Sequence, residues 1–112
     1  MEPPAGELVQ GLRSLDDGFV PPIFDPTILD RKFIVRPRES IEWLRRLLDD
    51  CGVFAGVSSG AAVAGAAKMA AQMESGTIVT LLPDAGWKYL SSGAWTDDLD
   101  EVVERATRIN YW

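Results

Sequence analysis

The turn at residues 56–60, with the sequence GVSSG, separates a short apolar run from a segment made almost entirely of alanine, glycine and valine. Glycine has no Cβ, so Gly56 and Gly60 allow another group to approach the backbone closely. The hydroxyls of Ser58 and Ser59 lie where a helix is predicted to begin, beside main-chain N–H groups that the helix leaves unpaired. Such a strand-to-helix corner is typical of a site for a buried cofactor or an oxyanion. A serine cap on a tightly packed helix remains the structural alternative.

The composition is that of one small globular domain. The 112 residues are 46% hydrophobic and 25% charged, with a net charge of −6, and this length suffices for a single domain. An acidic chain repels phosphate backbones and anionic lipids, so we expect neither nucleic acid nor a membrane surface as a partner. The first residues, MEPP, lack the basic and apolar regions of a signal peptide, and there is no run of about 18 apolar residues, so we expect no signal peptide and a cytoplasmic location.

The chain contains no histidine and a single cysteine, Cys51. The absence of histidine removes the commonest general base and the commonest metal ligand. One cysteine can form neither an internal disulfide nor, by itself, a zinc site. We therefore expect no metal, and we expect Cys51 to be a small packed hydrophobe rather than a nucleophile.

The order of elements predicts an α/β fold. We expect strands at residues 32–36, 53–55 and 77–82, and helices at residues 37–51, 59–74 and 97–109, after a loop-rich segment over residues 1–31. Pro37 and Gly52 are expected to begin and end the first helix. Alternation of strands and helices favours a partial three-layer αβα arrangement with a small, mainly parallel sheet.

The run at residues 77–82, TIVTLL, is apolar on both of its predicted faces. A strand of this kind is typical of a sheet that helices cover on both sides. Three strands make too narrow a sheet for that, so the pattern indicates a piece of a larger α/β domain.

Residues 56–60 also match the G-x-S-x-G turn of serine hydrolases, in which Ser58 would be the nucleophile. A serine nucleophile needs an activating base, and histidine is absent. Lys68 lies two helical turns beyond the serine and is predicted to point away from it. A hydrolase is therefore the least favoured of the functions considered.

Several motifs, in this order, resemble the C-terminal third of the pyridoxal-phosphate-dependent cysteine synthases, enzymes of the β-family and fold type II. They are EP at residues 2–3, GLRSLDDGFVP at 11–21, FDP at 24–26, GVFAGVSSGA at 52–61 and PDAGWKYLSSG at 83–93. The resemblance is greatest to the O-phosphoserine sulfhydrylase, or cysteine synthase B, type. It implies that residues 1–96 are the C-terminal portion of the synthase large domain and that residues 97–112 are a C-terminal amphipathic helix and tail.

The resemblance also implies a role for four residues. Ser58 matches the serine whose hydroxyl meets the pyridine nitrogen of pyridoxal 5'-phosphate, and Pro83 and Asp84 match residues that line the same ring edge. Arg13 matches a position that can bind the phosphate of the amino-acid substrate. The implied reaction is a β-replacement in which O-phosphoserine or O-acetylserine and a sulfur donor give L-cysteine.

Other parts of the family's active site lie upstream of the matched segment. They are the Schiff-base lysine, the loop that binds the substrate carboxylate and the loop that binds the cofactor phosphate, and Lys88 does not correspond to that lysine. We therefore expect no catalytic residue in this chain, an inactive isolated fragment, and a homodimer for the complete enzyme. The alternative is a non-catalytic interaction module derived from this fold.

Overall fold

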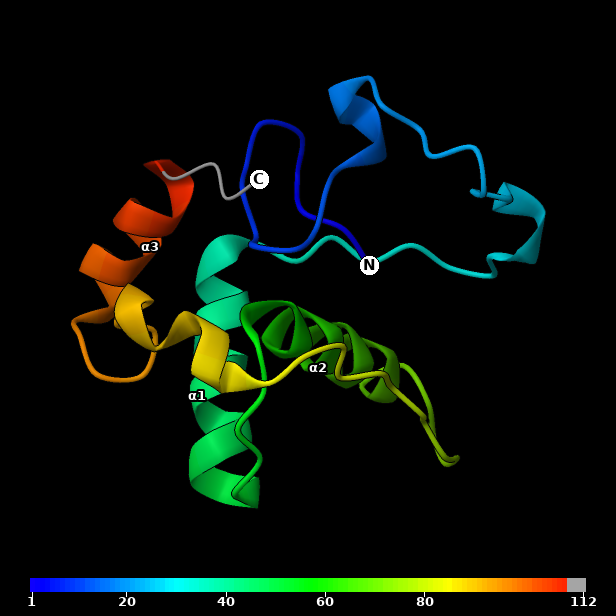
Figure 1. The fold of residues 1–112 in the computed structure, drawn as a ribbon. Coiled ribbons are helices and arrows are strands. Elements are labelled where there is room, and N and C mark those ends of the chain that lie inside the picture. The colour runs from blue at the N-terminus through cyan, green and yellow to red at the C-terminus, as the bar shows by residue number, and fades with distance from the viewer. Residues whose placement is uncertain (109–112) are drawn as a thin grey trace.

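The computed structural model describes residues 1–108 (Figure 1). It contains three α-helices, α1 (Pro37–Cys51), α2 (Val57–Ala70) and α3 (Leu99–Arg108), and three 3₁₀-helices, η1 (Leu15–Asp17), η2 (Pro26–Ile28) and η3 (Gly86–Ser92). Both α2 and α3 pack against α1. The first 36 residues form a looped segment, the N-terminal arm, which lies on one side of the three α-helices (Figure 1).

The two ends of α1 are those that the sequence predicts. Pro37 is the first helical residue, and the Glu39 carboxylate accepts a hydrogen bond from the Arg36 N–H at 2.9 Å. Gly52 ends the helix with a φ of 67°, a conformation that glycine adopts without strain. The loop before α1 and the turn after it are thus both determined by local sequence.

The small residues of α2 allow it to pack closely against α1. An added Cβ on Gly60 would overlap the Ser40 carbonyl oxygen and lie 2.8 Å from Leu44 Cβ. The Ser40 hydroxyl donates a 2.8 Å hydrogen bond to the Val57 carbonyl, which ties the two helices together at the same point. Gly60 is therefore required by packing between helices.

The start and end of α2 differ from the prediction. Its N-cap is Gly56, no side chain caps it, and Ser58 and Ser59 lie inside the first turn. The serine-cap alternative is therefore wrong. The helix ends at Ala70, four residues before the predicted end, and residues 71–74 form a turn and irregular chain.

The predicted sheet is not present within residues 1–108. The pairings found there are isolated bridges, one parallel (Glu2 with Ile34) and two antiparallel (Val9 with Leu12, and Ala55 with Ala85). The segment at residues 77–82 is irregular, and Val79 and Leu81 are 88% and 81% exposed. A strand needs a hydrogen-bonded neighbour, and the described residues provide none for this segment.

The core lies where α1, α2 and α3 meet the N-terminal arm. It consists of Val9, Val35, Ile41, Leu44, Val57, Ala61, Ala64, Ala94 and Val102. Cys51 is not part of it: the residue is exposed, as are the neighbouring residues 49–54 at the end of α1 and just after it. The expectation that Cys51 packs as a buried hydrophobe is wrong.

The acidic helix near the C-terminus is confirmed as α3. The Asp98 carboxylate accepts hydrogen bonds from the Asp100 and Glu101 N–H groups at 2.9 and 3.3 Å, which caps the helix. Arg45 of α1 donates to the carbonyls of Ala94 and Asp97, both at 2.7 Å, and so fixes the loop that precedes α3. Ile109, which the sequence assigns to this helix, lies outside the described residues.

Candidate functional site

A cleft of about 990 Å³ lies between α2 and the segment at residues 78–84. This segment runs along α2 in Figure 1 before it enters η3. The walls are mostly apolar: Ala62, Gly65 and Ala66 face the cleft from α2, and Ile78, Val79 and Leu81 face it from the other side. Ser58, Pro83, Asp84 and Tyr89 also line it, so three of the four predicted site residues come together here.

Ser58 presents a hydroxyl to this cleft from the first turn of α2. The residue is only 6% exposed, and its side chain has no hydrogen-bond partner among residues 1–108. Gly11, which has a φ of 84°, lies directly against it, since an added Cβ on Gly11 would be 3.5 Å from Ser58 Oγ. A hydroxyl that lines a cleft and has no partner in the protein is available to a ligand.

Asp84 lies against the start of α2. The Gly56 N–H donates to the Asp84 carbonyl at 2.9 Å, and the Tyr89 hydroxyl donates to Asp84 Oδ2 at 2.7 Å. The other carboxylate oxygen, Oδ1, is buried and has no hydrogen-bond partner within residues 1–108, and an added Cβ on Gly56 would overlap it. Gly56 is therefore the residue that allows the carboxylate to approach α2.

Sequence reasoning missed Tyr89, whose contact with Asp84 was not anticipated. Burial of the Tyr89 ring, followed by its hydrogen bond to the negatively charged Asp84, raises the pKa of this tyrosine to about 12. A proline-aspartate pair at the start of a 3₁₀ turn brings the tyrosine five residues later back to the carboxylate. The motif PDAGWKY could have indicated this pair from its spacing.

Replacing Asp84 with asparagine will lower the Tyr89 pKa from about 12 part of the way to its ordinary value near 10, because the acceptor loses its charge. The folded-state pKa is the higher one, so this pair stabilises the fold fully below pH 10 and the stabilisation is lost as the pH rises from about 10 through 12. Tyrosinate absorbance against pH measures the shift. The Tyr89→Phe variant identifies which titration belongs to this residue, since the sequence contains two tyrosines. An unchanged titration in Asp84→Asn would contradict the contact.

Arg13, the fourth predicted residue, lies outside the cleft. It lines a neighbouring hollow of about 250 Å³ together with Glu2, Arg31 and Lys32. Met1 and Leu29 line both spaces, so the hollow and the cleft adjoin. The Arg13 guanidinium is 5.8 Å from the centre of the Phe19 ring. Three cationic side chains thus gather beside the cleft in a chain that is acidic as a whole.

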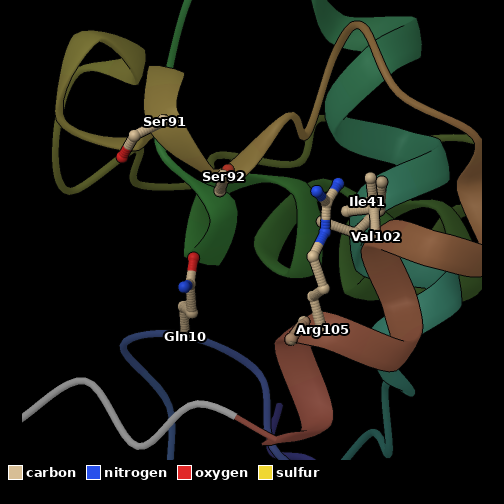
Figure 2. Close-up of a pocket in the computed structure, with 7 residues that line it drawn as sticks. Gln10, Ile41, Ser91, Ser92, Val102 and Arg105 are labelled. Carbon is tan, nitrogen blue, oxygen red and sulfur yellow. The ribbon is translucent and has the colours of Figure 1, made fainter.

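A further cavity, of about 60 Å³, lies between α3, η3 and the N-terminal arm. Figure 2 shows Gln10 extending into this region from the arm and Arg105 extending into it from α3. It contains none of the predicted site residues and is too small to hold an aromatic ring. The large cleft is therefore the candidate site.

The environment of Ser58 does not support a hydrolase. The Lys68 ammonium donates to the Ile34 carbonyl at 2.6 Å and pairs with Glu39 at 2.7 Å, so it is not placed to activate the serine. The carboxylate of Asp84 at the start of α2 would also oppose a developing oxyanion.

Within residues 1–108, no group of three or more cysteine, aspartate or glutamate side chains could hold a metal ion. None of the helices there is long and apolar enough to cross a bilayer.

Two solved structures share this arrangement of helices and loops. Cysteine synthase from Entamoeba histolytica superposes with a TM-score of 0.71 at 23% identity, covering 94% of this chain and 32% of that one. A mutant of O-ureido-L-serine synthase with bound O-ureido-L-serine gives a TM-score of 0.74 at 27% identity, covering 98% of this chain and 38% of that one. The chain therefore has the fold of about one third of such an enzyme.

The family model described as "Pyridoxal-phosphate dependent enzyme" matches residues 2–84. The chain belongs to this family, and the family resemblance inferred from its motifs is confirmed.

Curated relatives agree with this assignment. The chain is 37% identical over 93 residues to the cysteine synthase of Aquifex aeolicus, covering 80% of this chain and 28% of the relative. It is 34% identical over 95 residues to cysteine synthase B of Pseudomonas aeruginosa (85% and 32%) and 38% identical over 97 residues to cysteine synthase A of Escherichia coli (84% and 29%). The chain thus spans about 30% of the length of these relatives.

Proposed function

We propose that this chain forms one wall of the active site of a pyridoxal-phosphate-dependent cysteine synthase, which makes L-cysteine from O-phosphoserine or O-acetylserine and a sulfur donor. Residues 1–96 are assigned to the C-terminal portion of the large domain and residues 97–112 to a terminal helix and tail. The observation that carries the proposal is the cleft in which Ser58, Pro83 and Asp84 meet. The complete enzyme is proposed to be a cytoplasmic homodimer.

The cleft suits one edge of a planar pyridine ring. Its sides are apolar, its floor carries the Ser58 hydroxyl, and Gly11 lines it without a side chain directly against Ser58. Pyridoxal phosphate, when bound, supplies the electron sink that allows the β-substituent to leave. Ser58 would hold the ring nitrogen with a neutral hydroxyl, while Pro83 and the apolar walls would keep the ring in its plane and exclude water.

The segments predicted as strands are proposed to form a sheet in the complete enzyme. Residues 32–36, 53–55 and 77–82 are assigned to a mainly parallel sheet that is completed by other segments of the large domain. The strong exposure of Val79 and Leu81 supports this assignment, because a complete domain buries side chains of this kind. The parallel bridge between Glu2 and Ile34 would belong to the same sheet.

A chimera tests the proposed function. Residues 2–95 replace the matching segment of the Aquifex aeolicus cysteine synthase, and cofactor absorbance and cysteine formation from inorganic sulfide are measured. We expect the chimera to bind pyridoxal phosphate and to form cysteine, and we expect the isolated chain to form none. A folded chimera that binds no cofactor would contradict the proposal.

Arg13 is proposed to recognise a phosphate on the amino-acid substrate. The guanidinium lies in a hollow that also contains Arg31 and Lys32 and that opens beside the cleft. Replacing Arg13 with alanine in the chimera should raise KM for O-phosphoserine about tenfold, because a charge-assisted hydrogen bond is lost. KM for O-acetylserine, which carries no phosphate, should stay within about twofold. Equal changes for both substrates would show that Arg13 acts through the fold instead.

A further inference from the structure

The start of α2 has no acidic residue of its own to balance its dipole. Its N-cap is Gly56, its first turn contains neither aspartate nor glutamate, and no side chain caps it. The unpaired N–H groups and the dipole of such a helix end attract anions. Ser58 lies in this turn, lines the cleft, is only 6% exposed and has no hydrogen-bond partner among the described residues. A ligand that reaches this floor would therefore meet both the hydroxyl and the helix end.

The negative charge that balances the dipole of α2 comes from Asp84, about thirty residues further along the sequence. Its side chain is 20% exposed, and Oδ1 is buried against Gly56 at the helix end. Tyr89 fixes the carboxylate through the 2.7 Å hydrogen bond to Oδ2, and the Lys88 ammonium is 3.9 Å from the same oxygen. Tyr89 and Lys88 thus both contact Oδ2, and Oδ1 is left facing the start of α2.

We propose that Asp84, held in place by Tyr89, is a specificity-determining residue of this cleft. Because its carboxylate occupies the positive end of α2, the floor of the cleft accepts groups that donate a hydrogen bond or carry positive charge, and it rejects anions. Tyr89 is then a positioning residue, because its hydroxyl prevents the carboxylate from turning away from Gly56. This inference rests on the proposed function only in taking the cleft as a ligand-binding site.

The test uses the whole 112-residue chain and two probes of opposite charge. Inorganic phosphate is the anion, and 4-aminopyridine, a cationic ring at neutral pH, is the donor. Binding is followed through the NMR shifts of the Gly56, Ser58 and Ser59 amides. The variants are Asp84→Asn and Tyr89→Phe, and Asp49→Asn removes an exposed acidic group of α1 as the control for net charge.

Wild type should bind 4-aminopyridine at these amides and show no saturable shift with phosphate. Asp84→Asn should gain phosphate affinity at least about tenfold and lose 4-aminopyridine affinity about tenfold, which corresponds to one charge interaction of moderate strength. Tyr89→Phe should shift both affinities in the same directions by smaller factors, and Asp49→Asn should match wild type.

A purely structural role for Asp84 would weaken both probes together, and that result overturns the proposal. A saturable phosphate shift of the Gly56, Ser58 and Ser59 amides in wild type overturns it without any variant, which keeps the test decisive if Asp84→Asn fails to fold. Failure of the chimera to bind cofactor would leave these measurements unaffected, so the two proposals fail separately.

Discussion

Replacing Gly60 with alanine will lower the free energy of unfolding by about 3 kcal/mol, since a backbone atom blocks the new methyl group. The added Cβ would overlap the Ser40 carbonyl oxygen and lie 2.9 Å from the Leu44 nitrogen. Neither group can rotate away, so α1 and α2 must separate, and the Ser40–Val57 hydrogen bond weakens with them. Urea unfolding of the 112-residue chain measures the loss.

Gly65→Ala is the matched control on the same helix. Its added Cβ would meet only the side chain of Met1, at 3.3 and 3.4 Å, and that flexible side chain can move. Because alanine favours a helix more than glycine does, this variant should be as stable as wild type or up to about 1 kcal/mol more stable. Equal losses from both substitutions would contradict the close packing of α1 against α2 at Gly60.

Replacing Gly56 with alanine will lower the free energy of unfolding by about 2 kcal/mol and will also disrupt the cleft. Gly56 has a φ of −77° and a ψ of 171°, which alanine adopts easily, so the backbone causes none of the loss. The added Cβ would overlap Asp84 Oδ1 and lie 2.7 Å from Tyr89 Cε2. Both side chains must move, and their hydrogen bond must break or lengthen.

The titration of Tyr89 distinguishes this effect from general destabilisation. In Gly56→Ala the Tyr89 pKa should fall from about 12 toward its ordinary value, because burial and the Asp84 contact both diminish. In Gly60→Ala, whose contacts lie on α1, the same pKa should stay where it is. A Gly56→Ala variant that loses stability and keeps a Tyr89 pKa of about 12 would argue against the arrangement at the start of α2.

Helix α1 was predictable because its limits depend on local chemistry. Proline at the first helical position and glycine in a left-handed conformation act within a few residues, and both are found as predicted. The end of α2 was not predictable in the same way. Residues 71–74 are compatible with a helix, but they are largely exposed, so little burial stabilises a further helical turn.

The sheet could not be predicted from strand propensity alone. Residues 77–82 have the composition of a buried strand, yet strand formation depends on hydrogen bonds to a neighbouring strand, and such a neighbour is often distant in sequence. Within residues 1–108 the neighbours are absent, and the segment is left irregular with its apolar side chains exposed. Composition therefore indicated a burial that the described residues do not provide.

The site was predictable in its composition but not in its internal contacts. The motifs around Ser58 and Asp84 brought both residues to one cleft, as the resemblance implied. The contact between Tyr89 and Asp84 across Gly56 was missed, because it depends on the path of η3 in three dimensions. The role of each residue toward a cofactor stays a prediction.

The adjacent serines offer the most direct test of the central claim, that the Ser58 hydroxyl faces a bound cofactor ring. Ser58 lines the cleft, whereas the Ser59 hydroxyl is fully buried and has no hydrogen-bond partner in the described part of the chain. The dissociation constant for pyridoxal phosphate is measured in the chimera carrying Ser58→Ala or Ser59→Ala. We expect Ser58→Ala to raise it about tenfold, the effect of one lost hydrogen bond, and Ser59→Ala to leave it within about twofold. Equal dissociation constants for the two variants, or a larger effect from Ser59→Ala, would contradict the account.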